Sequence, residues 1–211
     1  MKRQVRRNVF ETNSSSMHSL VIKKESVYFT NEEARDGIYV NENGIFDLSL
    51  EEMYFGRSPF QVLYTLLDKA KYVLASMCMY KDDAVYKEVK NVIHSYIPEF
   101  IDFELELRAH TYNSISTTEE EIKKWAGEGN YAKKDDNWIT WEYELGGVDK
   151  DILSSFLKKE NITITEFLKN KRYIVIVDGD EYCIYKDMKK NGLINTDNIE
   201  KEYPYGGCMD D

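Results

Sequence analysis

Cysteine, proline, tryptophan and histidine are scarce in this sequence, which has three of each among 211 residues. An odd number of cysteines without paired spacing excludes both a disulfide framework and a CxxC zinc site, and it favours a reducing cytosol. His18, His94 and His110 lie too far apart for an HxxxH or HxH pair. The sequence therefore predicts no metal site.

Long apolar runs are also missing. The basic residues 1–7 are not followed by an apolar segment of signal-peptide length, because Glu11 and polar neighbours intervene. The most apolar stretch, residues 60–79, contains Asp68 and Lys69, which are costly in a bilayer and easily placed on a half-exposed helix. We therefore expect a cytoplasmic protein with no membrane span.

Positive charge is scarce as well. Lysine and arginine total 28 against 38 aspartates and glutamates, for a net charge of -10, which argues against general nucleic-acid binding. Residues 1–7 hold four of the cations and no acid, so the rest of the chain carries a net charge of -14. A nucleic-acid binder that uses the basic tip with Tyr28 or Tyr39 is accordingly the least favoured functional class.

The chain does contain enough apolar material for a core. Hydrophobic residues make up 42% and aromatic residues 13% of the sequence, which excludes wholesale disorder. The length fits one domain of ordinary size. We expect a single globular domain over residues 1–211, with a basic tip at residues 1–8 and a loose tail at residues 203–211.

Alternating apolar and polar residues predict several strands. The most β-prone run, residues 173–177, is followed by Asp178-Gly179, the signal for a tight hairpin with residues 181–185. Residues 127–136 are polar and contain glycine, which indicates a loop. The predicted strands cover residues 17–22, 101–107, 138–145 and 172–186, with two short strands at 38–40 and 44–48 around a turn at 41–44.

Two longer helices are predicted between these strands. Ser58 and Pro59 provide an N-cap and a first-turn proline for a helix over residues 59–80, and a second helix over residues 82–96 ends before Pro98. The short connection favours an antiparallel helix hairpin. The predicted fold class is therefore α+β: a mostly antiparallel sheet with a two-helix hairpin packed on one face.

Polar N-cap signals precede three further apolar segments, and each predicts a short helix. The signals are Thr117 with Glu120 or Thr118 with Glu121, then Asp149, and then Thr163 with Glu166.

The feature least explained by folding alone is a polar cluster near the N-terminus. Its hydroxyl, amide and imidazole groups can hold phosphate or carboxylate oxygens, and His18 could act as an acid or a base. If His18 begins a strand, Ser19 points to the opposite face, so only part of the cluster can meet one ligand. The predicted ligand-binding residues are Arg6, Arg7, Asn13, Ser14, Ser15, Ser16, His18 and Ser19.

A purely structural interpretation of the same cluster stays open. Asn and Ser side chains at a strand entrance commonly satisfy the local backbone in Asx and Ser turns. A Walker phosphate loop is excluded, because the cluster has no glycine and no Gly-Lys-Ser/Thr end.

Residues 7–20, RNVFETNSSSMHSL, resemble the N-terminal signature of a group of uncharacterised proteins found in phages and in low-GC bacteria with their mobile elements. Residues 176–182, IVDGDEY, are a second anchor of this resemblance. The group has no established activity, so the resemblance implies a mobile-element context and no mechanism.

Three other residues are weak candidates for catalysis. Glu142 and Glu144 form an ExE pattern on one strand face, which resembles the glutamate pair of mono-ADP-ribosyltransferases. In that family an arginine and a serine-rich strand come first, but here Arg7 and Ser14 are too close to occupy separate strands. Solvated residues on an amphipathic strand are therefore the favoured interpretation. His110 is predicted at a strand-to-loop edge, where sites often lie.

A second cluster of acidic residues coincides with the predicted hairpin turn after residue 177. Asp178, Asp180 and Glu181 carry oxygens of the kind that Mg²⁺ prefers. Because Asp-Gly between two β-prone runs is a strong hairpin signal, we favour the turn and predict no metal there.

Two hypotheses about function follow. In the first, the protein is an accessory protein of a phage or mobile element with a site for a phosphate-bearing, nucleotide-like small molecule at the N-terminal Ser/His cluster; whether it is an enzyme stays open, because no catalytic motif is complete. In the second, it is a non-catalytic acidic protein that inhibits or redirects a basic host protein, one that binds nucleic acid or acts in defence.

Overall fold

The computed structural model describes most of the chain between residues 17 and 205, with several gaps. The residues described are 17–48, 61–78, 84–105, 108–113, 118–126, 131–134, 137–142, 150–178, 190 and 197–205. Within them the protein is an α+β fold whose strand pairs are mostly antiparallel, as predicted. None of the helices found there is long and apolar enough to cross a membrane.

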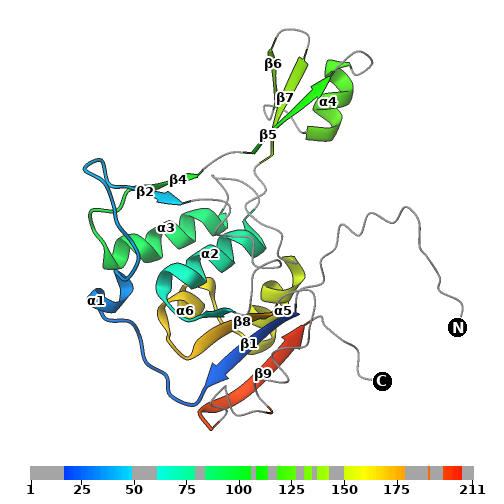
Figure 1. Cartoon of the computed structure of the whole chain (residues 1–211). Coiled ribbons are helices and arrows are strands. Elements are labelled where there is room, and N and C mark those ends of the chain that lie inside the picture. The colour runs from blue at the N-terminus through cyan, green and yellow to red at the C-terminus, as the bar shows by residue number, and fades with distance from the viewer. Residues whose placement is uncertain are drawn as a thin grey trace, which may run out of the picture.

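A four-stranded antiparallel sheet forms the base of the fold (Figure 1). Its order is β3 (Gln61–Leu63), β8 (Tyr173–Asp178), β1 (Met17–Lys23) and β9 (Ile199–Tyr205). In β1, Leu20 lies opposite Val175 of β8 and Tyr203 of β9. β1 and β8 are thus the interior strands, which agrees with the apolar runs at residues 20–22 and 173–177.

The two faces of this sheet have different surroundings. Leu20 and Ile22 of β1 belong to the main core together with the apolar residues of the helices. Val21, between them in sequence, packs instead with Ile174 and Ile176 of β8 in a small separate cluster. The two-residue alternation of a strand therefore divides β1 between the helix-covered face and the opposite face.

Four helices pack together over the main core: α2 (Leu66–Met77), α3 (Ala84–Tyr96), α5 (Lys150–Glu160) and α6 (Ile164–Lys169). α2 contacts each of the other three. Glu88 of α3 accepts hydrogen bonds from the amide and the hydroxyl of Thr165, at 2.9 and 2.8 Å, and so closes the start of α6. A polar contact as well as apolar packing therefore holds α3 against the start of α6.

Two strands that the sequence places far apart form a parallel pair. β2 (Ile45–Leu48) runs beside β4 (Asp102–Leu105). The predicted turn at residues 41–44 forms just before β2, with Gly44 at a φ of +74°. A side chain at Gly44 would collide with the carbonyl of Glu99, so glycine allows the close approach of the two segments.

A small α/β unit lies between β4 and α5 in the chain. It comprises β5 (Arg108–Asn113), α4 (Glu119–Ala126), β6 (Tyr131–Lys134) and β7 (Asn137–Glu142), with β7 in the centre of an antiparallel sheet. Figure 1 shows this unit away from the four-stranded sheet, beyond β2 and β4. All three tryptophans of the chain, Trp125, Trp138 and Trp141, lie in α4 and β7.

The prediction of a single sheet is wrong, because the strands within the described residues form three separate sheets. Residues 38–40 are not a strand: Ile38 donates its amide to Arg35 and continues the turn after α1 (Asn31–Ala34). The predicted loop at residues 127–136 contains β6, and the predicted loose tail begins inside β9. Both edges of β8 are occupied by β1 and β3 at Val175–Val177, while residues 181–185 lie outside the described part.

The helix predictions are mostly confirmed, with one wrong start. α2 begins at Leu66 because Thr65 and Asp68 form the capping box and because Gln61–Leu63 pair with β8 as β3. Ser58 and Pro59 lie outside the described residues, as does the connection between α2 and α3. α3 ends before Pro98, and Thr118 with Glu121 and Thr163 with Glu166 mark the starts of α4 and α6.

Candidate functional site

The N-terminal Ser/His cluster is only partly described. Arg6, Arg7, Asn13, Ser14, Ser15 and Ser16 lie outside the described residues. His18 and Ser19 are in β1, each with 1% of its surface exposed. They lie on opposite faces of the sheet, which agrees with the sequence argument that one ligand cannot meet both.

His18 lies on the helix-covered face. Its Nδ1 is 3.2 Å from the hydroxyl of Tyr72 of α2, and the two rings are 5.7 Å apart between centroids. Tyr72 is fully buried. His18 therefore joins β1 to α2 inside the protein, an arrangement that offers no open surface to a substrate.

Ser19 lies on the other face, where its register partner in β8 is Ile176. Its hydroxyl is buried and makes no hydrogen bond to any residue that the structure describes. A buried hydroxyl without a partner loses its hydration and gains nothing in return. Ser19 is thus a locally unfavourable residue opposite Ile176 of the small apolar cluster.

Two of the weak catalytic candidates, His110 and Glu142, lie on paired strands, two register positions apart. His110 is inside β5 opposite Thr140, and Glu142 ends β7 opposite Arg108. Glu144 lies outside the described residues. Over the part of the chain that is described, no group of three or more His, Cys, Asp or Glu side chains is placed to hold a metal ion.

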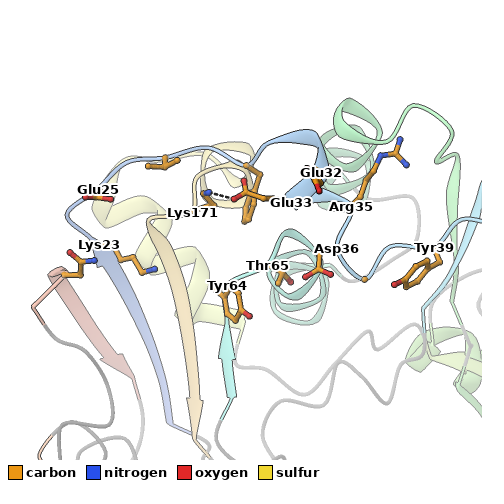
Figure 2. Close-up of a pocket in the computed structure, with 14 residues that line it drawn as sticks. Lys23, Glu25, Glu32, Glu33, Arg35, Asp36, Tyr39, Tyr64, Thr65 and Lys171 are labelled. Carbon is orange, nitrogen blue, oxygen red and sulfur yellow. Dashed lines mark hydrogen bonds and ion pairs between the residues drawn. The ribbon is translucent and has the colours of Figure 1, made fainter.

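A pocket of about 670 Å³ opens at the other end of β1 (Figure 2). It is bounded by the ends of β1 and β9, by the segment that contains α1, and by the start of α2. Its volume is in the range usual for small-ligand sites. The residues that line it are Lys23, Glu25, Val27, Phe29, Glu32, Glu33, Arg35, Asp36, Gly37, Tyr39, Tyr64, Thr65, Lys171 and Asn198.

One wall of the pocket is formed by residues 24–30, which are fastened to the end of α6. The amide of Phe29 donates to the carbonyl of Lys169 at 3.1 Å, and the amide of Lys171 donates to the carbonyl of Val27 at 2.7 Å. The Tyr28 hydroxyl donates to Glu166 at 2.8 Å, and the hydrogen bond with this carboxylate raises the tyrosine's pKa. These bonds hold the wall in one position.

A buried lysine supports this wall from inside. Lys69 of α2 is fully buried, and its Nζ donates to the carbonyls of Phe167 and Asn170 at 2.8 and 2.9 Å. The ammonium also lies 4.9 Å from the ring centroid of Phe29, a pocket residue. Burial lowers the pKa of Lys69 to about 7, and the nearby Glu166 opposes this shift.

The charges of the pocket are mixed, and two of its three cations are already paired. Lys171 forms an ion pair with Glu33 at 2.7 Å, and this hydrogen bond, with one from the Thr30 backbone, lowers the pKa of Glu33 to about 2. Arg35 pairs with Glu99 outside the pocket. No hydrogen bond or ion pair engages the Lys23 ammonium within the described residues. Lys23 is therefore the cation available to a ligand.

The N-terminus of α2 is closed by its own side chains. Asp68 donates its amide to the hydroxyl of Thr65 at 3.1 Å, and the amide of Thr65 donates to the Asp68 carboxylate at 3.3 Å. This reciprocal capping box places a carboxylate at the helix start. An incoming anion would meet that negative charge there, so the anionic part of a ligand belongs nearer to Lys23.

The pocket was not predicted from the sequence, and it is far from the predicted cluster. β1 runs from Met17 to Lys23, a distance of about 20 Å at the usual rise per strand residue. The lining residues come from separate segments whose local sequences show no motif. Exposed Tyr39, which the sequence singled out as a weak nucleic-acid contact, is the one partial signal.

Comparisons of the chain with protein-family models, with curated proteins and with solved structures give no match.

Proposed function

We propose that this protein is a cytoplasmic accessory protein of a phage or mobile element that binds a phosphate-bearing, nucleotide-like small molecule. The observation that carries the proposal is the pocket of about 670 Å³ with Lys23 and Tyr64 in its walls. The ligand type is the one that the sequence suggested. The site we favour is the pocket, because His18 is engaged in the core and Ser19 lies on the opposite face of β1.

The lining chemistry supports a ligand with both a ring and a charge. Tyr64 and Tyr39 line the pocket with 58% and 82% of their surface exposed, so both rings are accessible. Exposed aromatic rings stack on nucleobases of any sequence. Lys23 provides a cation near them. We do not assign a reaction, because no nucleophile and base are paired in the described part of the pocket.

Binding is tested by isothermal titration calorimetry against a panel of nucleosides, nucleotides and dinucleotides. The wild-type protein is expected to bind at least one member, and Tyr64→Ala is expected to weaken that binding about tenfold, the usual loss of one stacking contact. Val62→Ala, a change at an exposed residue two positions earlier and outside the pocket, is the matched control. No binding by any member, or equal binding by Tyr64→Ala, would overturn the proposal.

The acidic interaction protein is the second candidate, and α4 favours it. The first turn of α4 carries Glu119, Glu120 and Glu121, all exposed. A cluster of this kind speeds association with a basic partner. Pull-down of host proteins at low and high salt tests it: a basic partner released by salt and lost from a Glu119→Gln/Glu120→Gln variant supports this role, and retention of nothing by the wild type contradicts it.

A further inference from the structure

The charges in the pocket are arranged along its length. In Figure 2, Lys23 and Lys171 lie toward the end of the sheet, Asp36 and Tyr39 lie toward the other side, and Tyr64 is between them. Asp36 and Glu32 are exposed acids of this second side, and no described residue pairs with their carboxylates. The pocket therefore has an available cation at one end and available hydrogen-bond acceptors at the other.

The charge balance limits how negative a ligand can be. The lining contains three cations and four acids, and Lys171 and Arg35 are already paired with Glu33 and Glu99. Glu25, one of these four acids, places a negative charge on the Lys23 side. A single phosphate suits Lys23, whereas a chain of phosphates would face the remaining carboxylates, because like charges in a pocket repel.

The middle of the pocket favours a flat ring. Tyr64 projects between the two ends in Figure 2, and the apolar Phe29 and Val27 line the wall fastened to α6. A nucleotide whose ring stacks on Tyr64 would have its phosphate toward Lys23. The far edge of the ring would then face Asp36. An amino group on that edge could donate to Asp36, which is a charge-assisted hydrogen bond.

We propose that the pocket selects a nucleoside monophosphate whose base carries an exocyclic amine, with the phosphate at Lys23, the ring at Tyr64 and the amine at Asp36. This inference rests on the proposed function and specifies its ligand and orientation. A free amino acid is a poorer fit, because its ammonium and carboxylate are on the same carbon and cannot reach the two ends together.

Four probes test the orientation by calorimetry: AMP, purine riboside 5′-monophosphate, which lacks only the 6-amino group, adenosine, which lacks the phosphate, and ATP. AMP is expected to bind about tenfold more tightly than each of the other three, the usual effect of one charge-assisted hydrogen bond or one unfavourable charge. CMP serves as a second amine-bearing monophosphate and is expected to bind.

Two variants test which residue contacts which part of the nucleotide. Lys23→Ala is expected to weaken AMP about tenfold and to leave adenosine unchanged, and Asp36→Ala is expected to weaken AMP and to leave purine riboside 5′-monophosphate unchanged. Lys87→Ala and Asp47→Ala change exposed residues outside the pocket and are the matched controls. Neither test variant alters a core residue, so folding is preserved.

The outcomes separate this inference from the proposed function. If a nucleotide binds in a Tyr64-dependent manner but ATP or the amine-free analogue binds as well as AMP, the orientation is wrong and the binding function stands. If both variants bind AMP as the wild type does, the assigned contacts are wrong. If no nucleotide binds at all, the proposed function fails with the inference.

Discussion

The two ends of β1 differ in almost every property that matters for a binding site. At its start, His18 and Ser19 are buried, one against Tyr72 and the other in an apolar cluster. At its end, Lys23 opens onto a pocket with an ammonium that no described residue engages. The imidazole and hydroxyl groups at the start of β1 therefore lie in the protein interior. At the end of β1, the Lys23 ammonium is available for binding.

The largest expected effect on stability is that of a substitution in the buried half of β1. Leu20 is fully buried between β8 and β9, so Leu20→Ala removes apolar contacts and leaves a cavity. Such changes cost about 2–5 kcal/mol of unfolding free energy. Urea denaturation measures the loss, and Val62→Ala at a partly exposed position of β3 is the control. A loss below about 1 kcal/mol would contradict the close packing of this half.

The next effect comes from Lys69 under the pocket wall. Its pKa is about 7 in the folded protein, against its ordinary value of 10.5 when exposed. Between these values the unfolded chain holds more protons than the folded one, so stability should rise with pH, by up to about 1.4 kcal/mol per unit. Urea denaturation from pH 6 to pH 9 measures the slope, which should be flat below about 7.

Lys69→Met is expected to remove the rise of the unfolding free energy with pH, whatever its effect on the stability at a given pH. Lys158→Met on the exposed side of α5 is the matched control and should keep it. The carboxylates with lowered pKa, such as Glu33 and Glu99, titrate in acid, and Tyr86, whose pKa burial raises, titrates in strong base. An unchanged slope in Lys69→Met would show that another group titrates in this range.

Ser19 should show a smaller effect of opposite sign. Because its buried hydroxyl has no partner among the described residues, Ser19→Ala is expected to stabilise the protein by about 1 kcal/mol. The control is Ser76→Ala, since the Ser76 hydroxyl is also buried but donates to the Tyr72 carbonyl at 2.6 Å. Thermal denaturation should show a gain in midpoint temperature for Ser19→Ala that Ser76→Ala does not match, and a lower midpoint for Ser19→Ala would indicate a bonded hydroxyl.

The smallest effect on stability is expected at the open end of β1. Lys23→Ala removes a side chain whose ammonium has no hydrogen-bond or ion-pair partner among the described residues, so the unfolding free energy should change by less than about 0.5 kcal/mol. Chemical denaturation provides the comparison with Leu20→Ala. A large loss would mean that Lys23 supports the fold, and the contrast between the two ends would disappear.

The sequence correctly predicted those helices and strands whose bounds depend on residues close by in the chain. The strand at β1, the end of α3 before Pro98 and the start of α6 at Thr163 depend on neighbouring residues and were correct. The start of α2 was wrong because β3 forms only when Gln61–Leu63 meet β8, a contact between distant segments. The parallel pairing of β2 with β4 is equally non-local.

The candidate site was harder to predict for the same reason. A dense polar cluster such as residues 13–19 attracts attention in a sequence, yet its described members are interior residues. The pocket combines a strand end, a short helical segment and a helix start, and none of its residues belongs to a recognisable motif. Its properties depend on which charges are already paired, for example Lys171 with Glu33, and pairing is not readable from spacing.

The placement of the tryptophans determines what optical measurements can report. Because Trp125, Trp138 and Trp141 all lie in α4 and β7, tryptophan emission monitors the small α/β unit and not the four-stranded sheet or the pocket. Circular dichroism, by contrast, averages over every helix and strand. Unfolding curves recorded with the two probes coincide only if both parts melt as one cooperative system, so a mismatch between them would measure how independently the unit folds.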